Sequence, residues 1–204
     1  MQRRFLGYFL GSAFVFIIIP SLANAQAVQP LCPVCTAASP GFDKDSGFCL
    51  PSSVTDLTLV PASAQNIALD KADGSTSVSF IDKRKMFGVT AQFQNRPKPT
   101  KTADTAFVRA IEQHMLATHQ GAKMPLTEVG VFELGQREYP AHGRVFTWPV
   151  TGGTLTSILW VVPHKKRYLA ITTEYIDTKD GGLQAMVKAA EVQTNLASQI
   201  CETR

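Results

Sequence analysis

The stretch that most constrains the fold runs from Leu155 to Ile176, where two apolar runs flank the basic turn His164-Lys165-Lys166-Arg167. Both runs are rich in β-branched and aromatic residues, a pattern typical of a β-hairpin. The first run places apolar residues on both sides of the pleat: Ile158, Trp160 and Val162 on one side, Leu159 and Val161 on the other. A strand that is apolar on both sides is typical of the middle of a covered sheet. We therefore expect this hairpin to be central and Trp160 to be nearly fully buried.

The first 25 residues have the three parts of a secretory signal peptide. Two arginines precede an apolar core from Phe5 to Ile19, and Ala23-Asn24-Ala25 is a small-x-small cleavage site. The core is shorter than the roughly 20 residues that span a bilayer, which argues against an uncleaved anchor. We expect cleavage between Ala25 and Gln26, and a periplasmic or secreted product with no transmembrane segment.

The remaining 179 residues are enough for one domain with a sizeable core. They contain 18 Lys and Arg against 16 Asp and Glu, and so mild an excess predicts no nucleic-acid partner. Residues 26–53 are rich in Pro, Gly, Ser and Asp, without a periodic apolar pattern. This arm cannot build a core of its own, so we expect a cysteine-containing arm at 26–53 and a single domain at 54–204.

Four short β-like segments begin that domain, at residues 56–60, 66–71, 75–81 and 86–94. The last of them alternates cleanly, with Phe87, Val89, Ala91 and Phe93 on one face and smaller or polar residues on the other. Because side chains alternate between the two faces of a strand, this pattern predicts one buried face and one wetter face.

A helix is predicted over residues 102–120, with Thr102 or Asp104 as its cap and Gly121 at its end. Two more strand-like segments, 127–134 and 143–150, lead into the central hairpin and make a four-stranded meander. A second helix follows Asp180-Gly181-Gly182. Its predicted apolar stripe consists of Leu183, Met186, Val187, Ala190, Leu196 and Ile200.

Strands, a helix, a meander and a terminal helix make an α+β domain. We expect an antiparallel sheet of about six strands, two helices packed on one face, and a disulfide-stapled N-terminal arm.

Two stretches resemble a known family. Residues 41–51, GFDKDSGFCLP, are similar to the opening "G-F-x-hydrophobic-x-P" of PsbP-like domains, and residues 134–141, LGQREYPA, are similar to their "G-x-x-apolar-x-x-x-aromatic" strand entry. The order of elements also resembles this family of the extrinsic photosystem subunit and its bacterial relatives. The resemblance implies a non-enzymatic accessory or binding protein and transfers no functional residue to this chain.

All four cysteines, Cys32, Cys35, Cys49 and Cys201, lie in the part expected to be exported, where two disulfides are the default. Cys32-Pro33-Val34-Cys35 has the spacing of a thiol-disulfide redox centre, but no strand precedes it and no amphipathic helix follows it. Structural cystines are therefore favoured. A zinc site on the four cysteines is disfavoured by the oxidising compartment, and Thr36 replaces the histidine that covalent haem attachment needs.

The expected connectivity joins Cys201 to Cys32 or Cys35, and the remaining member of that pair to Cys49. In the chain-entropy model, a disulfide that closes a longer loop restricts the unfolded chain more. The other pairing, a Cys32–Cys35 ring with a Cys49–Cys201 bond, stays open.

The histidines form no predicted metal site. His114 and His119 are five residues apart on the predicted helix and lie roughly 140° apart around its axis. We expect His114 on the packing face. The chain has no G-x-S-x-G elbow, phosphate-binding glycine loop or H-E-x-x-H motif, so no catalytic residue, metal or cofactor is predicted.

Two basic turns, Lys83-Arg84-Lys85 and His164-Lys165-Lys166-Arg167, remain. The first interpretation is a solvated hairpin end that discourages edge pairing. The alternative is a contact for an acidic partner or for membrane head groups, made by Lys83, Arg84, Lys85, Lys165, Lys166 and Arg167.

The sequence as a whole favours an exported, non-enzymatic accessory or binding protein, whose partner is an envelope protein or a small ligand. The alternative is a thiol-disulfide redox protein that uses Cys32 and Cys35.

Overall fold

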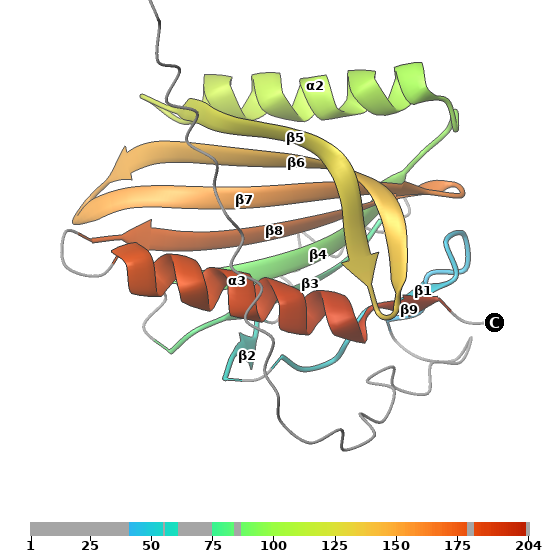
Figure 1. Cartoon of the computed structure of the whole chain (residues 1–204), viewed down its shortest axis with the longest axis horizontal. Helices are drawn as coiled ribbons and strands as arrows, with labels where there is room; N and C mark the ends of the chain where they lie inside the picture. Colours follow the sequence, from blue (N-terminus) through green and yellow to red (C-terminus); the bar gives the residue numbers. More distant parts are fainter. Residues whose placement is uncertain (1–40, 55, 61–74, 84–86, 179–181, 203–204) are drawn as a thin grey trace, which may run out of the picture.

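The computed structural model describes residues 41–54, 56–60, 75–83, 87–178 and 182–202 (Figure 1). The expected signal peptide, Cys32 and Cys35, and the strand predicted at 66–71 lie outside these residues. Among the described residues, no helix has the length and apolar character needed to span a membrane.

A seven-stranded antiparallel sheet forms the body of the α+β fold (Figure 1). In chain order its strands are β2 (Thr58–Leu59), β3 (Thr76–Ile81), β4 (Phe87–Asn95), β5 (Lys123–Leu134), β6 (Arg137–Val150), β7 (Gly153–His164) and β8 (Arg167–Asp177). Their order across the sheet is β2-β3-β4-β8-β7-β6-β5. The β7–β8 hairpin therefore lies between β4 and β6, which confirms its predicted central place, and β5 to β8 form the predicted four-stranded meander.

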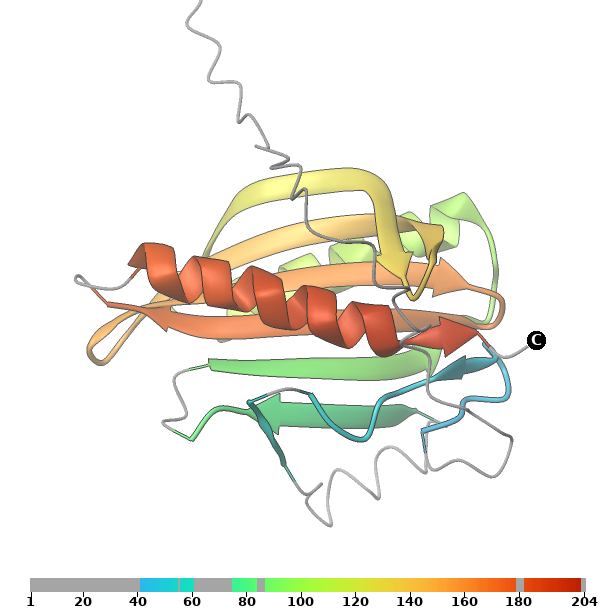
Figure 2. The same cartoon turned by 60° about the horizontal axis from the view of Figure 1, so that its bottom comes forward.

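The two helices, α2 (Lys101–Thr118) and α3 (Gly182–Gln199), cover opposite faces of the sheet (Figure 2). On one face, Leu196 of α3 belongs to a core with Leu169 and Ile171. On the other face, Val108 of α2 packs with Val161 and other residues of β6, β7 and β8. The expectation that both helices share one face is wrong. The physical reason is that a central hairpin with apolar side chains on both sides has to be covered twice.

Helix α2 has its N-cap two residues before Thr102 and four residues before Asp104, the two predicted caps. Thr100 is the N-cap, and its hydroxyl oxygen accepts a hydrogen bond from the backbone N–H of Ala103 at 3.2 Å. Thr102 and Asp104 are therefore not caps. The Asp104 carboxylate instead binds the guanidinium of Arg96, with an N–O distance of 2.7 Å.

The predicted apolar stripe of α3 is correct only in its second half. Leu196 and Ile200 are fully buried, whereas Leu183, Met186 and Val187 are 72%, 47% and 48% exposed. Ala189 and Val192, which the predicted stripe does not contain, are buried, and Ala190, which it does contain, is exposed.

The described part of the arm lies against the end of the chain. Strand β1 (Phe48–Cys49) pairs with β9 (Cys201–Glu202), and Cys49 is directly opposite Cys201. Neither is a free thiol. Phe48 is fully buried and its ring stacks on that of Phe93 at 6.3 Å. Burial of this ring holds the described part of the arm on the sheet.

Candidate functional site: a groove beside helix α2

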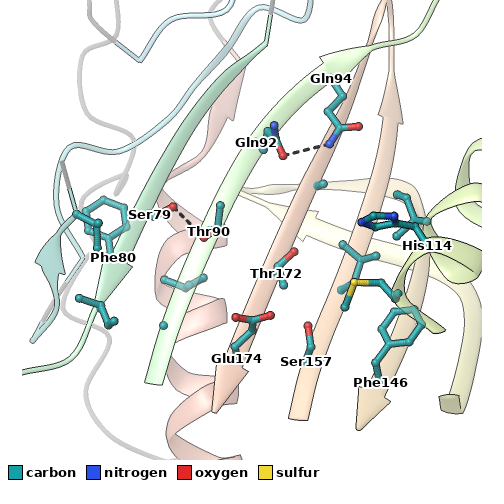
Figure 3. A pocket seen from close by; sticks show the side chains of 18 of the residues that line it. Ser79, Phe80, Thr90, Gln92, Gln94, His114, Phe146, Ser157, Thr172 and Glu174 are labelled. Atoms are coloured by element: carbon teal, nitrogen blue, oxygen red, sulfur yellow. Dashed lines mark hydrogen bonds between the residues drawn. The ribbon is translucent and has the colours of Figure 1, made fainter. Parts of the chain in front are cut away.

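The candidate site is a groove between α2 and the strands β3, β4, β8 and β7, with a volume of about 690 Å³ (Figure 3). It forms because α2 packs on β6, β7 and the near side of β8, while the same face of β3 and β4 extends beyond the helix. The volume lies within the range of roughly 300 to 1,000 Å³ that is typical of small-molecule sites.

One side of the groove is apolar. Helix α2 contributes side chains one turn apart along its inner face, and β6, β7 and β8 contribute the apolar floor: Phe107, Ala110, Ile111, Met115, Phe146, Leu159 and Ala170. The ring of Phe107 stacks on that of Tyr168 with a centroid distance of 3.9 Å. This stacking fixes the helix against β8 and gives the groove a firm wall.

The other side of the groove is polar, because it is the wetter face of β4 that alternation predicts. Ser79 and Thr90 share a hydrogen bond of 2.9 Å across β3 and β4, and Gln94 donates one of 3.1 Å to Gln92 (Figure 3). Thr172 of β8 continues this polar floor. The groove thus offers hydroxyl and amide groups opposite an apolar wall.

Ser157 and Glu174 close one end of the polar floor. They are register partners on β7 and β8, and both side chains point into the groove (Figure 3). Ser157 is fully buried, and its Oγ has no hydrogen-bond partner among the described residues. A buried hydroxyl without a partner is costly to the fold and calls for an explanation. Thr173 Oγ1 and Gln193 Nε2 are also buried without a partner among the described residues, but only Ser157 of the three lines the groove. Glu174 forms no ion pair with any described residue.

The histidines lie apart from one another. His114 is exposed and points into the groove from α2, so its predicted place on the packing face is wrong (Figure 3). His119 stacks on Trp148 at 4.1 Å. Burial and then the charge of Arg144 lower the pKa of His142. Among the described residues, no three His, Cys, Asp or Glu side chains are arranged to hold a metal ion.

The two basic turns lie at opposite ends of the sheet. Strand β4 starts at Phe87, after the first turn, and its last residue Asn95 pairs with Arg167 at the second turn. Lys83 is exposed at its end of the sheet, and Lys166 is exposed at the other. Arg84 and Lys85 lie outside the described residues.

The second turn binds acidic groups of the protein itself. Arg167 is buried and its guanidinium contacts Asp43 at 3.1 Å and Asp45 at 3.2 Å. Lys165 Nζ lies 2.5 Å from a carboxylate oxygen of Glu202 and donates to the Ser46 carbonyl at 2.9 Å. These contacts lock the turn to the arm and to β9.

Sequence reasoning missed the groove residues as a site. The signal that could have found part of it is the polar face of β4, which alternation exposes as Thr90, Gln92 and Gln94. Nothing local in the sequence places Ser157 and Glu174 next to them, because β7 and β8 begin 58 and 72 positions after the last residue of β4.

No family model matches the chain, and no curated protein matches it. Among solved structures, the chain is similar to cyanobacterial PsbP from Synechocystis, at 11% identity and TM-score 0.47, over 80% of this chain and 96% of that one. It is similar to LpqN of Mycobacterium tuberculosis, which is described as involved in cell envelope biogenesis. The identity is 17% and the TM-score 0.38, over 77% of this chain and 83% of LpqN. It is also similar to the Ran-binding protein Mog1p of Saccharomyces cerevisiae, at 11% identity and TM-score 0.40, over 62% of this chain and 79% of Mog1p. These likenesses concern the fold alone and assign no ligand or site residue to this chain.

Proposed function

We propose that this protein is an exported, non-enzymatic binding protein that holds a small amphipathic molecule in the groove beside α2. The observation that carries the proposal is the fully buried Ser157 hydroxyl, which lines the groove and has no partner among the described residues. A ligand with polar groups along one side and an apolar body along the other fits the two sides of the groove.

The binding proposal is tested with the neutral fluorescent probe N-phenyl-1-naphthylamine, which brightens in apolar surroundings. We expect the wild-type protein to bind it. Ala110→Trp places an indole in the groove from α2 and should abolish binding. The matched control is Ala106→Trp, because Ala106 is exposed on the same helix, one turn earlier, and does not line the groove. Equal binding by both variants would locate the probe elsewhere and contradict the proposal.

Export is part of the same proposal and rests on residues 1–25 of the sequence. The signal peptidase should cleave between Ala25 and Gln26, so the protein isolated from its native host should begin at Gln26. Mass spectrometry of the intact protein measures this. Retention of Met1 would contradict export and the disulfide proposal that depends on it.

The third part of the proposal concerns the disulfide bonds of the N-terminal arm. We propose that Cys201 is bonded to Cys32 or Cys35, and that the other of these two is bonded to Cys49. The β1–β9 pairing supports a staple between the arm and the end of the chain, because it brings the described part of the arm beside Cys201. It also places Cys49 opposite Cys201, so the choice between the pairings rests on the loop-entropy argument. Peptide mapping without reduction identifies the bonds. A Cys32–Cys35 ring would contradict the pairing and favour the redox alternative.

A further inference from the structure

The groove has an electrostatic preference. Glu174 is the only Asp, Glu, Lys or Arg among its described lining residues, and it forms no ion pair with a described residue. A carboxylate repels anions and attracts cations. Glu174, although solvent-exposed, brings this charge to the lining of the groove. An anionic amphiphile is therefore a poor occupant.

The hydroxyl groups beside Glu174 can act as acceptors for a ligand group that donates several hydrogen bonds. Ser157 is opposite Glu174 across the β7–β8 pair, and Thr172 lies two residues earlier on the same face of β8 (Figure 3). An ammonium group has three donors and no acceptor. The Glu174 carboxylate and the hydroxyl oxygens of Ser157 and Thr172 can each accept one of its hydrogens, and Ser157 would gain the partner that it lacks.

The groove also offers an apolar surface for the part of such a ligand that carries no charge. Phe146 of β6 is the register partner of Ser157, Leu159 lies two residues after Ser157 on β7, and Met115 of α2 lines the groove with them. These side chains provide the apolar surface that an alkyl chain or an aromatic ring covers on binding.

From these contacts we propose that the groove binds primary amines that carry an apolar chain or ring, with the ammonium group held between Glu174 and Ser157. This inference rests on the proposed function and specifies the ligand class of the same site.

The test uses three molecules with the same eight-carbon chain: octylamine, octanol and octanoate. Each displaces N-phenyl-1-naphthylamine from the wild-type protein at pH 7. We expect octylamine to act at a concentration about tenfold lower than octanol, because of its charge-assisted hydrogen bonds, and octanoate to be the weakest. Octanoate as effective as octylamine would overturn the inference and leave the proposed function standing. Failure of the probe and of all three molecules to bind would overturn both.

Glu174→Gln removes the charge and keeps the shape. It should abolish the advantage of octylamine over octanol while the neutral probe still binds. The matched control, Glu138→Gln, makes the same change of net charge at an exposed residue of β6 that does not line the groove, and it should keep the advantage. Loss of the advantage in both variants would show a general charge effect and overturn the inference.

Ser157→Ala separates binding from folding. The Ser157 hydroxyl has no partner among the described residues, so its removal should leave the stability of the free protein unchanged or raise it. The same variant should bind octylamine several-fold more weakly. Unchanged binding of octylamine would remove Ser157 from the site.

Discussion

The indole of Trp160 lies directly against Gly143. The two residues are register partners on β7 and β6, and a Cβ on Gly143 would lie 2.9 Å from Cη2 of the indole. Phe132 of β5 covers part of the same ring at a centroid distance of 5.0 Å. Trp160 is nevertheless only half-buried, so its predicted near-complete burial is wrong. Phe132 of the edge strand β5 contributes to its cover, and the core beneath α3 contacts it as well.

Gly143→Ala should therefore destabilise the protein by about 1 to 3 kcal/mol, because the new methyl group forces the indole out of place. Urea unfolding measures the loss. Gly130→Ala is the control, since a Cβ at Gly130 would have its nearest contact at 3.6 Å, an ordinary distance. Equal losses in the two variants would mean that the indole is not the cause.

A second experiment tests the same contact from the other side. In a Trp160→Leu background the large ring is gone, so Gly143→Ala should cost about 1 kcal/mol less than it does in the wild-type protein. A double-mutant cycle gives this coupling. A coupling of zero would contradict the contact.

The Arg96–Asp104 ion pair should make the free energy of unfolding depend on pH in the acidic range. Burial alone would raise the pKa of Asp104, but hydrogen bonds from Arg96 and Tyr168 and the charge of Arg96 outweigh it and hold the pKa below its usual value. A carboxyl whose pKa is lower in the folded protein stabilises it above the unfolded pKa of about 3.9, and this contribution disappears as the pH falls through the folded pKa.

We expect Asp104→Asn to cost roughly 3 kcal/mol at pH 7, because it leaves the largely buried Arg96 guanidinium without its carboxylate. The variant should also lose less stability than the wild type as the pH falls from 4 towards 2. Urea midpoints at several pH values measure both effects. Asp177→Asn, at an exposed carboxylate, should follow the wild type.

The phenol of Tyr168 should ionise at a higher pH than an ordinary tyrosine does. Burial and then its hydrogen bond to Asp104 raise the pKa of Tyr168 to about 12. The unfolded phenol ionises near 10, so this group's contribution to stability is complete below about pH 10 and is lost as the pH rises towards 12. The difference in phenolate absorbance between the wild type and Tyr168→Phe isolates this titration. A midpoint near 10 would show that Tyr168 is not enclosed by α2.

Glu202 should hold the end of the chain in place. Its carboxylate contacts Lys165 Nζ at 2.5 Å, His164 Nε2 at 3.2 Å, the Tyr139 hydroxyl at 3.2 Å and the Arg137 guanidinium at 3.3 Å. Glu202→Gln removes the charge that these donors share and should cost roughly 1 to 2 kcal/mol, an amount reduced by the exposure of Lys165 and Arg137.

The same variant should speed amide hydrogen exchange in β1 and β9 more than in the central strands, since the paired ends of the chain are held there. Glu191→Gln is the control, because the Glu191 side chain is 62% exposed on α3. Uniform acceleration across the sheet would mean that Glu202 acts on global stability alone.

The sequence by itself determined the elements whose pattern is local. Alternation along β4 predicted its buried face, with Val89 and Phe93, and its polar face. Apolar residues on both sides of β7 predicted a central strand, and the turn at Gly152 and Gly153 predicted its hairpin with β6. These features depend on the period of two residues in a strand and on turn chemistry, and neighbouring residues are enough to set both.

Only the tertiary structure decided which groups meet across the chain. The partner of Asp104 is Arg96 rather than the end of its own helix, and Glu202 lies beside Lys165, 37 positions earlier. The two helices take opposite faces, and the groove arises where α2 leaves β3 and β4 uncovered beside Ser157 and Glu174. Such contacts are set by strand order and helix placement, which depend on packing of the whole domain, so no periodicity along the chain records them.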